Sequence, residues 1–322
     1  MKPTVNSQPK LHSIAFVISI CVISLAFASR ISIDPIATIQ LITTPLFPNI
    51  ISRRMLGWIR CFIAGFISIV SGFKMRNVEY VSVNYLPSSK LISRPITLTG
   101  WRAQSSFTSW SWNVLGIYFA LSGLVTLYVN DHEKMTPSPD LDMLEKQLKP
   151  YLRMCIILFE IVAPLTMLVS AVVRYALWPI GLKQKNTDAM KHPLVMIQHN
   201  ANLFFALCEI SLLGGLPVRF EDMALAPLFG VVYIVFAWSI RYRWIPSKSG
   251  TYDDAQFLYF FLDTTLDGYT PTIFLAILVL VLSVFHCLFV VIDDVLVYLD
   301  GGIFMHILTV LGLASCFCRF RD

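Results

Sequence analysis

The chain alternates long apolar runs with short polar connections. A helix rises about 1.5 Å per residue, so about 20 apolar residues are needed to cross the hydrocarbon core of a bilayer. Runs of about this length lie at 55–73, 107–129, 151–178, 194–216, 223–238 and 273–292, and the longest polar connection lies at 74–101. The pattern therefore predicts an all-α, polytopic transmembrane helical bundle with six core spans and an ordered loop at the membrane face.

A further apolar run at 13–28 follows Lys2 and Lys10 and ends in the small residues Ala26 and Ala28. A basic start, an apolar middle and small residues before a cleavage point are typical of a secretory signal peptide, and the same run also fits an uncleaved anchor. Both interpretations send the chain into the secretory pathway. We expect a multi-pass protein of the endomembranes, with the endoplasmic reticulum and the plasma membrane as the two candidate locations.

The two ends of the chain are less regular. The segment 31–51 is broken by an aspartate and three prolines, which predicts an interfacial or re-entrant piece. The last apolar piece, 303–317, fits a seventh core span, a surface helix or a re-entrant hairpin. We therefore divide the chain into an N-terminal signal or anchor with an interfacial segment (1–54), a six-span membrane domain (55–292) and an apolar C-terminal tail (293–322).

The composition agrees with a membrane location. Of 322 residues, 56% are hydrophobic and 14% are charged, and the mean hydropathy is +0.67, whereas roughly a quarter of the residues of a soluble protein are charged. The net charge of +5 arises in short loops, and no basic patch with interleaved aromatic residues indicates nucleic-acid binding. The seven cysteines show neither disulfide nor zinc-ligand spacing, and we expect no metal and no organic cofactor. Arg60, near the start of the first run, is expected to extend its charge toward the headgroups.

Polar residues inside the apolar runs are the first functional candidates. The fourth run holds His199, Asn202 and Glu209, and the third run holds Glu160. Asp263 ends an aromatic cluster that precedes the sixth run, and we include it among these candidates. An ionisable group inside a membrane costs a few kcal/mol or more unless it is paired or lines a wet cavity. The alternative is that these residues only join helices.

Thr108 lies at the start of the second apolar run, among serines and tryptophans. Serine and threonine at a helix start commonly accept hydrogen bonds from free backbone N–H groups, and tryptophan favours the membrane–water boundary. By itself, this stretch indicates a capped helix with an aromatic anchor. The chain carries no phosphate-binding loop, no GxSxG elbow and no HExxH motif, so the standard signatures of soluble enzymes are missing from the sequence.

Three weak patches follow one another between about residues 100 and 292. They are Phe107-Thr108 with Tyr118-Phe119, His199 with Glu209, and Gly230-Val231-Val232-Tyr233 with Tyr259-Phe260-Phe261-Leu262-Asp263. In order and approximate spacing they resemble the androgen-induced-gene and androgen-dependent TFPI-regulating protein family of six-span membrane proteins. The resemblance implies an intramembrane hydrolase of fatty acid esters of hydroxy fatty acids, with Thr108 as the nucleophile and His199 as its partner. Family members often carry a second histidine where this chain has Met196.

These roles suit the residue types. A threonine hydroxyl needs a positioned base, and a neutral imidazole is suited to that task. Asn202, three residues after His199, lies beside it on a helix and can hydrogen-bond the imidazole or a developing oxyanion. Glu209 is a poor partner for His199, because ten residues separate the two side chains by roughly 80° and about 15 Å on an ideal helix. We expect Glu209 to pair with a residue of another helix, such as Arg174 or Arg241.

The leading hypothesis is therefore a membrane hydrolase that takes lipid esters from the bilayer and uses a threonine nucleophile with a histidine base. One rival is a proton or cation transporter or channel, which would use Glu160, His199, Glu209 and Asp263. The other rival is a membrane scaffold without chemistry, in which the buried polar groups only join helices.

Overall fold

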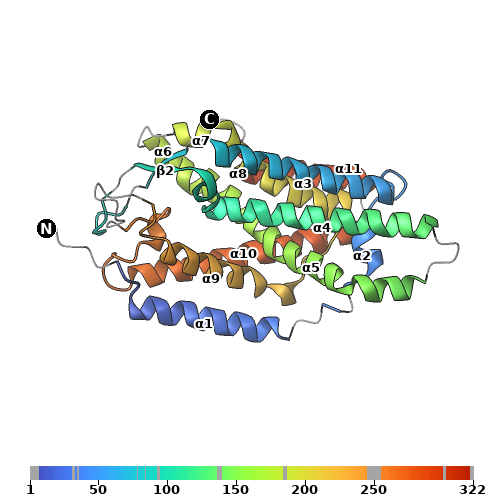
Figure 1. Cartoon of the computed structure of the whole chain (residues 1–322), viewed down its shortest axis with the longest axis horizontal. Helices are drawn as coiled ribbons and strands as arrows, with labels where there is room; N and C mark the ends of the chain where they lie inside the picture. Colours follow the sequence, from blue (N-terminus) through green and yellow to red (C-terminus); the bar gives the residue numbers. More distant parts are fainter. Residues whose placement is uncertain are drawn as a thin grey trace.

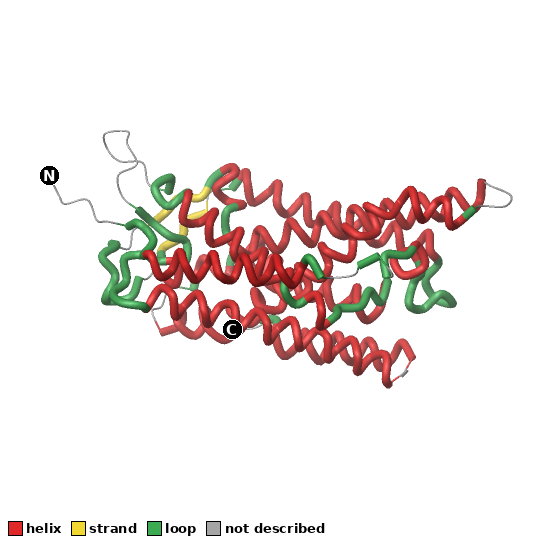
Figure 2. Tube along the Cα trace, turned by 90° about the horizontal axis from the view of Figure 1, so that it is seen from below, coloured by secondary structure: helices red, strands yellow, loops and turns green. Residues whose placement is uncertain are grey.

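The computed structural model describes residues 7–30, 33–34, 36–77, 79–83, 85–92, 95–135, 140–183, 187–244, 255–299 and 302–319. Its helices run roughly side by side along the long axis of the molecule (Figure 1). A single pair of short strands is described, and it lies at one end of this bundle (Figure 2). The predicted all-α, multi-pass architecture is confirmed.

The α-helices are α1 (Leu11–Ala28), α2 (Ile39–Thr43), α3 (Arg53–Arg76), α4 (Phe107–Met135), α5 (Leu141–Val172), α6 (Trp178–Lys183), α7 (Asp188–Lys191), α8 (Pro193–Cys208), α9 (Leu225–Ser239), α10 (Thr270–Leu299) and α11 (Gly302–Phe317). The π-helical turns are η2 (Val173–Leu177) and η3 (Glu209–Leu213), and the 3₁₀ turns are η1 (Gly100–Gln104), η4 (Phe220–Asp222) and η5 (Phe260–Leu262). Strands β1 (Glu79–Ser82) and β2 (Pro95–Leu98) are antiparallel, with Glu79 opposite Leu98.

Six helices of the described chain are long and apolar enough to cross a membrane: Leu11–Ala28, Arg53–Arg76, Phe107–Met135, Leu141–Lys183, Phe220–Ser239 and Thr270–Tyr298. The number agrees with the prediction, but the membership differs. α1 is one of the six, whereas the predicted span 194–216 is not. That stretch forms α8, which begins at Pro193 and changes to a π turn at Glu209.

Helix α5 lies at the centre of the bundle and packs against α4, α8, α9 and α10. Asp140 caps its start, because the Asp140 carboxylate accepts a hydrogen bond from the Met143 N–H at 3.0 Å. The helix continues without a break through Pro150 and Pro164. Proline removes one backbone hydrogen bond from a helix, but the helix can continue where neighbouring helices pack around that turn.

The interior contains large side chains from the central helices. Trp112, Tyr118 and Phe119 of α4 and Phe159 of α5 are fully buried, and the Tyr118 and Phe159 rings lie 5.0 Å apart between centroids. Gly123 allows a close approach of α3, because a Cβ there would meet the Cys61 Sγ at 2.8 Å. Close packing of α3 and α4 fixes the relative positions of the polar residues that these two helices carry.

The N-terminal segment before α3 covers one end of this core. Its Ile39 and Ile42 are buried in the same apolar cluster as α4 and α5. On the surface, Asp34 pairs with Arg153 of α5, and the hydrogen bond from that guanidinium lowers the pKa of Asp34 below its usual value. The segment predicted to be interfacial or re-entrant is therefore held to the bundle both by buried apolar side chains and by an ion pair at the surface.

Helix α1 packs against α9 and α10. Near its start, the Lys10 Nζ donates a hydrogen bond to the Gly268 carbonyl at 3.1 Å, and the His12 Nδ1 lies 2.6 Å from the Thr272 hydroxyl. These contacts join α1 to the segment that leads into α10. A retained anchor would make these contacts in the folded protein.

We therefore expect α1 to be retained in the mature protein, because its removal would expose the faces of α9 and α10 that it covers. Peptide mapping by mass spectrometry of protein purified from membranes should recover peptides that cross Ala28 and Ser29. A mature chain that begins at Ser29 would contradict this expectation.

Candidate functional site

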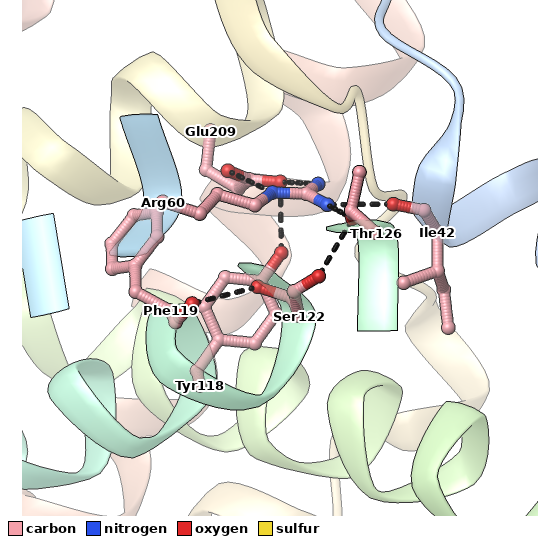
Figure 3. A network of polar contacts seen from close by, with 7 residues as sticks. All are labelled: Ile42, Arg60, Tyr118, Phe119, Ser122, Thr126 and Glu209. Carbon is pink, nitrogen blue, oxygen red and sulfur yellow. Dashed lines mark hydrogen bonds and ion pairs between the residues drawn. The ribbon is translucent and has the colours of Figure 1, made fainter. Parts of the chain in front are cut away.

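A fully buried ion pair joins Arg60 of α3 to Glu209 in the interior of the bundle (Figure 3). Both side chains are fully buried. The guanidinium pairs with Glu209 Oε1 through Nη2, and its Nε donates to Glu209 Oε2 at 3.3 Å. The prediction that Arg60 extends toward the headgroups is wrong, because its guanidinium points into the bundle and pairs with a buried carboxylate.

Further hydrogen bonds surround the pair. Arg60 Nη1 donates to the Ile42 carbonyl at 2.6 Å and to the Thr126 hydroxyl at 3.0 Å. The Tyr118 hydroxyl donates to Glu209 Oε1 at 2.8 Å (Figure 3). Both carboxylate oxygens are therefore occupied, and the pair joins α3, α4, η3 and the N-terminal segment. This arrangement is what a buried charge needs in order to be tolerated.

The local backbone explains how Glu209 reaches Arg60. The π turn η3 begins at Glu209, and the Gly215 N–H donates a hydrogen bond to the Glu209 carbonyl at 3.0 Å. A Cβ on Gly214 would collide with the Arg60 guanidinium and the Glu209 carboxylate, so a glycine is required there. Gly215 has a φ of +62°, which ends the helix in the left-handed region.

The predicted partners of Glu209 are engaged elsewhere. Arg174 donates to the carbonyls of Ser315 and Cys318, the latter at 2.6 Å. Arg241 donates to the Gln8 side chain at 3.0 Å. The expectation that Arg174 or Arg241 pairs with Glu209 is therefore wrong. The expectation that Glu209 pairs with another helix is confirmed.

Thr108 lies in the first turn of α4 and lines an apolar cavity of about 110 Å³. The cavity lies between α4, α5, α9 and α10, and its walls include Leu168, Val172 and Leu282. The start of α4 is held by two tyrosines of the same cavity wall. The Phe107 N–H donates to the Tyr259 hydroxyl at 3.1 Å, and the Tyr233 hydroxyl donates to the Ser105 carbonyl at 3.1 Å.

Next to Thr108, Ser109 belongs to a buried polar cluster that the sequence did not reveal. The Ser109 N–H donates to the Ser106 hydroxyl at 3.2 Å, which is the predicted serine cap. Lys74, in the last turn of α3, is buried, and its ammonium donates to Ser109 Oγ and to Gln198 Oε1, both at 3.0 Å. Lys74 thus links the residue after Thr108 to the residue before His199.

His199 lies on α8 beside this cluster. Its Nδ1 is buried and has no hydrogen-bond partner in the described part of the chain. Its backbone carbonyl accepts a hydrogen bond from Ser170 of α5, and the neighbouring Val169 and Val172 line the cavity that contains Thr108. No described hydrogen bond joins the Thr108 hydroxyl to the His199 imidazole. The two side chains belong to neighbouring helices without direct contact of this kind.

Asn202 points toward α4, where its amide donates to the Ser111 hydroxyl at 3.1 Å. Its carbonyl oxygen is buried and has no partner among the described residues. Asp263 lies far along the chain in the loop after η5, where it accepts hydrogen bonds from Ser89 and from the Thr265 N–H and hydroxyl at 2.8 and 2.7 Å. Asp263 thus stabilises its own loop. Asn202 lies on the same helix as His199 and joins that helix to α4.

Glu160 belongs to a separate buried group. Its Oε1 accepts the Arg219 N–H at 2.9 Å, and the His286 Nε2 donates to the Arg219 carbonyl at 2.9 Å. The Arg219 Nε donates to Asp222 Oδ2 at 2.7 Å. These side chains hold the turn η4 between the end of η3 and α9. Among the described residues, no group of three or more His, Cys, Asp or Glu side chains is arranged to hold a metal ion.

Comparison of the chain with family models, with curated proteins and with solved structures finds no match.

Proposed function

We propose that this protein is an intramembrane lipid-ester hydrolase in which Thr108 is the nucleophile and His199 is the base. Two observations motivate the proposal: Thr108 lines an apolar cavity between membrane helices, and on the adjacent helix α8 the buried Nδ1 of His199 makes no hydrogen bond to a described residue. The His199 Nδ1 therefore has hydrogen-bonding capacity that no described residue uses and that a substrate hydroxyl or water could use.

In the proposed reaction, the ester lies in the cavity with its carbonyl carbon beside the Thr108 hydroxyl. His199 accepts the hydroxyl proton while the threonine oxygen forms a bond to that carbon, and the protonated imidazole then gives the proton to the departing alcohol oxygen. Water then attacks the acyl-threonine while His199 accepts a proton from it, the bond between the acyl carbon and the Thr108 oxygen breaks, and the imidazolium returns the proton to that oxygen as the carboxylic acid leaves. Catalytic hydrogen bonds are often absent before substrate binds, so the missing Thr108–His199 bond is compatible with this scheme.

The transition-state negative charge would lie near two positive features. Thr108 is in the first turn of α4, where the helix dipole favours an anion. The Lys74 ammonium contacts the adjacent Ser109 hydroxyl. The apolar walls of the cavity favour a substrate with long hydrocarbon chains that enters from the bilayer.

Labelling of the purified protein with a lipophilic fluorophosphonate tests the proposal. We expect an adduct on Thr108 in the parent, loss of the adduct in Thr108→Ala, and its partial recovery in Thr108→Ser. Ser109→Ala is the matched control, because Ser109 is the adjacent hydroxyl and contacts a lysine at 3.0 Å. An adduct on Ser109, or equal labelling of Thr108→Ala and parent, would refute the assignment of Thr108.

A further inference from the structure

A second cavity, of about 430 Å³, lies between α1, α9 and α10. Its apolar walls include Ile20, Ile23 and Phe27 of α1, together with Pro227 of α9 and Val279 of α10. The last turn of α1 and the start of α9 lie near each other in the fold, at the end of α1 that leads to the N-terminal segment (Figure 1). The volume and the apolar lining of this cavity suit a hydrocarbon chain.

Two opposite charges lie at this cavity. Arg30 follows the end of α1 by two residues and is exposed. In the described chain, no carboxylate lies within ion-pair distance of Arg30. Glu221 lines the same cavity, and its side chain is 66% exposed, with one ion pair to Arg219 at 2.8 Å. Because α1 ends where an apolar span ends, both charges are at the level expected for lipid headgroups.

Glu221 is held in place by the turn that carries it. The Arg219 N–H binds the buried Glu160, and the Arg219 carbonyl accepts from the buried His286, each at 2.9 Å. The Arg219 guanidinium also binds Asp222 at 2.6 Å, so Glu221 shares its counter-ion with a second carboxylate. Glu221 therefore presents incompletely neutralised negative charge from a fixed position, which is a requirement for selective recognition.

We propose that this cavity binds one zwitterionic phospholipid. Arg30 binds the phosphate, Glu221 binds the ammonium group of the headgroup, and an acyl chain fills the cavity along α1. Only a headgroup that carries both a phosphate and an ammonium group can form charge-assisted hydrogen bonds with Arg30 and with Glu221 at the same time. An anionic lipid without an amine would satisfy Arg30 but would meet Glu221 as a like charge. The proposal concerns binding and does not depend on the hydrolase proposal.

The test uses the full chain, purified in detergent and incubated with vesicles that contain equal amounts of phosphatidylethanolamine and phosphatidylglycerol with the same acyl chains. Native mass spectrometry then counts the lipids retained on each protein molecule. We expect one phosphatidylethanolamine to be retained preferentially. Loss of one charge-assisted contact in Arg30→Gln or Glu221→Gln should lower its retention about tenfold.

Two further variants separate recognition from general effects. Arg54→Gln removes an exposed arginine near the start of another span, does not alter this cavity, and should retain the lipid as the parent does. Glu221→Lys should shift retention from phosphatidylethanolamine to phosphatidylglycerol. Equal retention of both lipids by the parent, or parent-like retention by both Arg30→Gln and Glu221→Gln, would overturn the proposal. Thermal unfolding of each variant shows whether a loss of lipid is instead a loss of fold.

Discussion

Replacing Glu209 by alanine is expected to destabilise the folded protein by roughly 3–5 kcal/mol, because the substitution leaves the Arg60 guanidinium buried without its counter-ion. Arg60 and Glu209 are both fully buried, so water cannot replace the lost carboxylate. Tyr118 loses its hydrogen-bond acceptor in the same substitution. For a chain of this size, a loss of this magnitude lowers Tm by on the order of 10 °C.

Thermal unfolding of the detergent-solubilised protein measures this effect. The matched control is Glu133→Ala, which removes the partner of Arg53 in an ion pair whose side chains are 22% and 33% exposed. Solvent screens that pair, so its loss should cost no more than about 1 kcal/mol. If Glu209→Ala unfolds at the same temperature as Glu133→Ala, the buried pair does not hold the helices together.

A double substitution gives a second check. Arg60→Met combined with Glu209→Met removes both charges and is expected to be more stable than Glu209→Ala alone, because no unpaired charge remains in the interior. The two effects should therefore be strongly non-additive, as expected for residues in direct contact.

Much of the architecture follows from the sequence because the bilayer leaves few choices. Backbone groups in hydrocarbon must be satisfied within each helix, so long apolar runs become helices whatever their detailed order. The helix α10 over 273–292 is the clearest case. The run at 194–216 was harder to predict, because its polar residues and the π turn at Glu209 interrupt a continuous span. Periodicity gives no signal for such a turn.

The polar contacts could be predicted only in part. Ser106 was recognisable as a cap because capping acts within one turn of the chain. The partner of Glu209 is 149 residues away, and nothing in its local sequence distinguishes Arg60 from Arg174 or Arg241. Lys74 was assigned to a polar loop by composition, yet α3 continues past it and buries it. Its long apolar stem allows an ammonium at a helix end to reach into the bundle.

The same contacts change the weight of the rival functions. A proton path through Glu209 would need a carboxylate that can exchange protons, but both Glu209 oxygens are held by Arg60 and Tyr118. Asp263 is likewise held by its own loop. A purely helix-joining role fits Glu209 well. For His199, the Nδ1 makes no hydrogen bond to a described residue that would join two helices.

Replacing His199 by alanine is therefore expected to remove most lipid-ester hydrolysis and to change stability little. Loss of a general base slows a reaction by roughly 10²–10⁴-fold, whereas the folded protein loses no hydrogen bond from Nδ1. Initial rates on a lipid ester in mixed micelles, together with Tm, measure the two effects separately. Asn200→Ala is the opposite control, because the Asn200 side chain binds the backbone of Arg319 at 2.7 and 2.8 Å. It should lower Tm more than His199→Ala and slow hydrolysis less. If His199→Ala instead lowers Tm and keeps the parent rate, His199 is a packing residue and the hydrolase proposal loses its base.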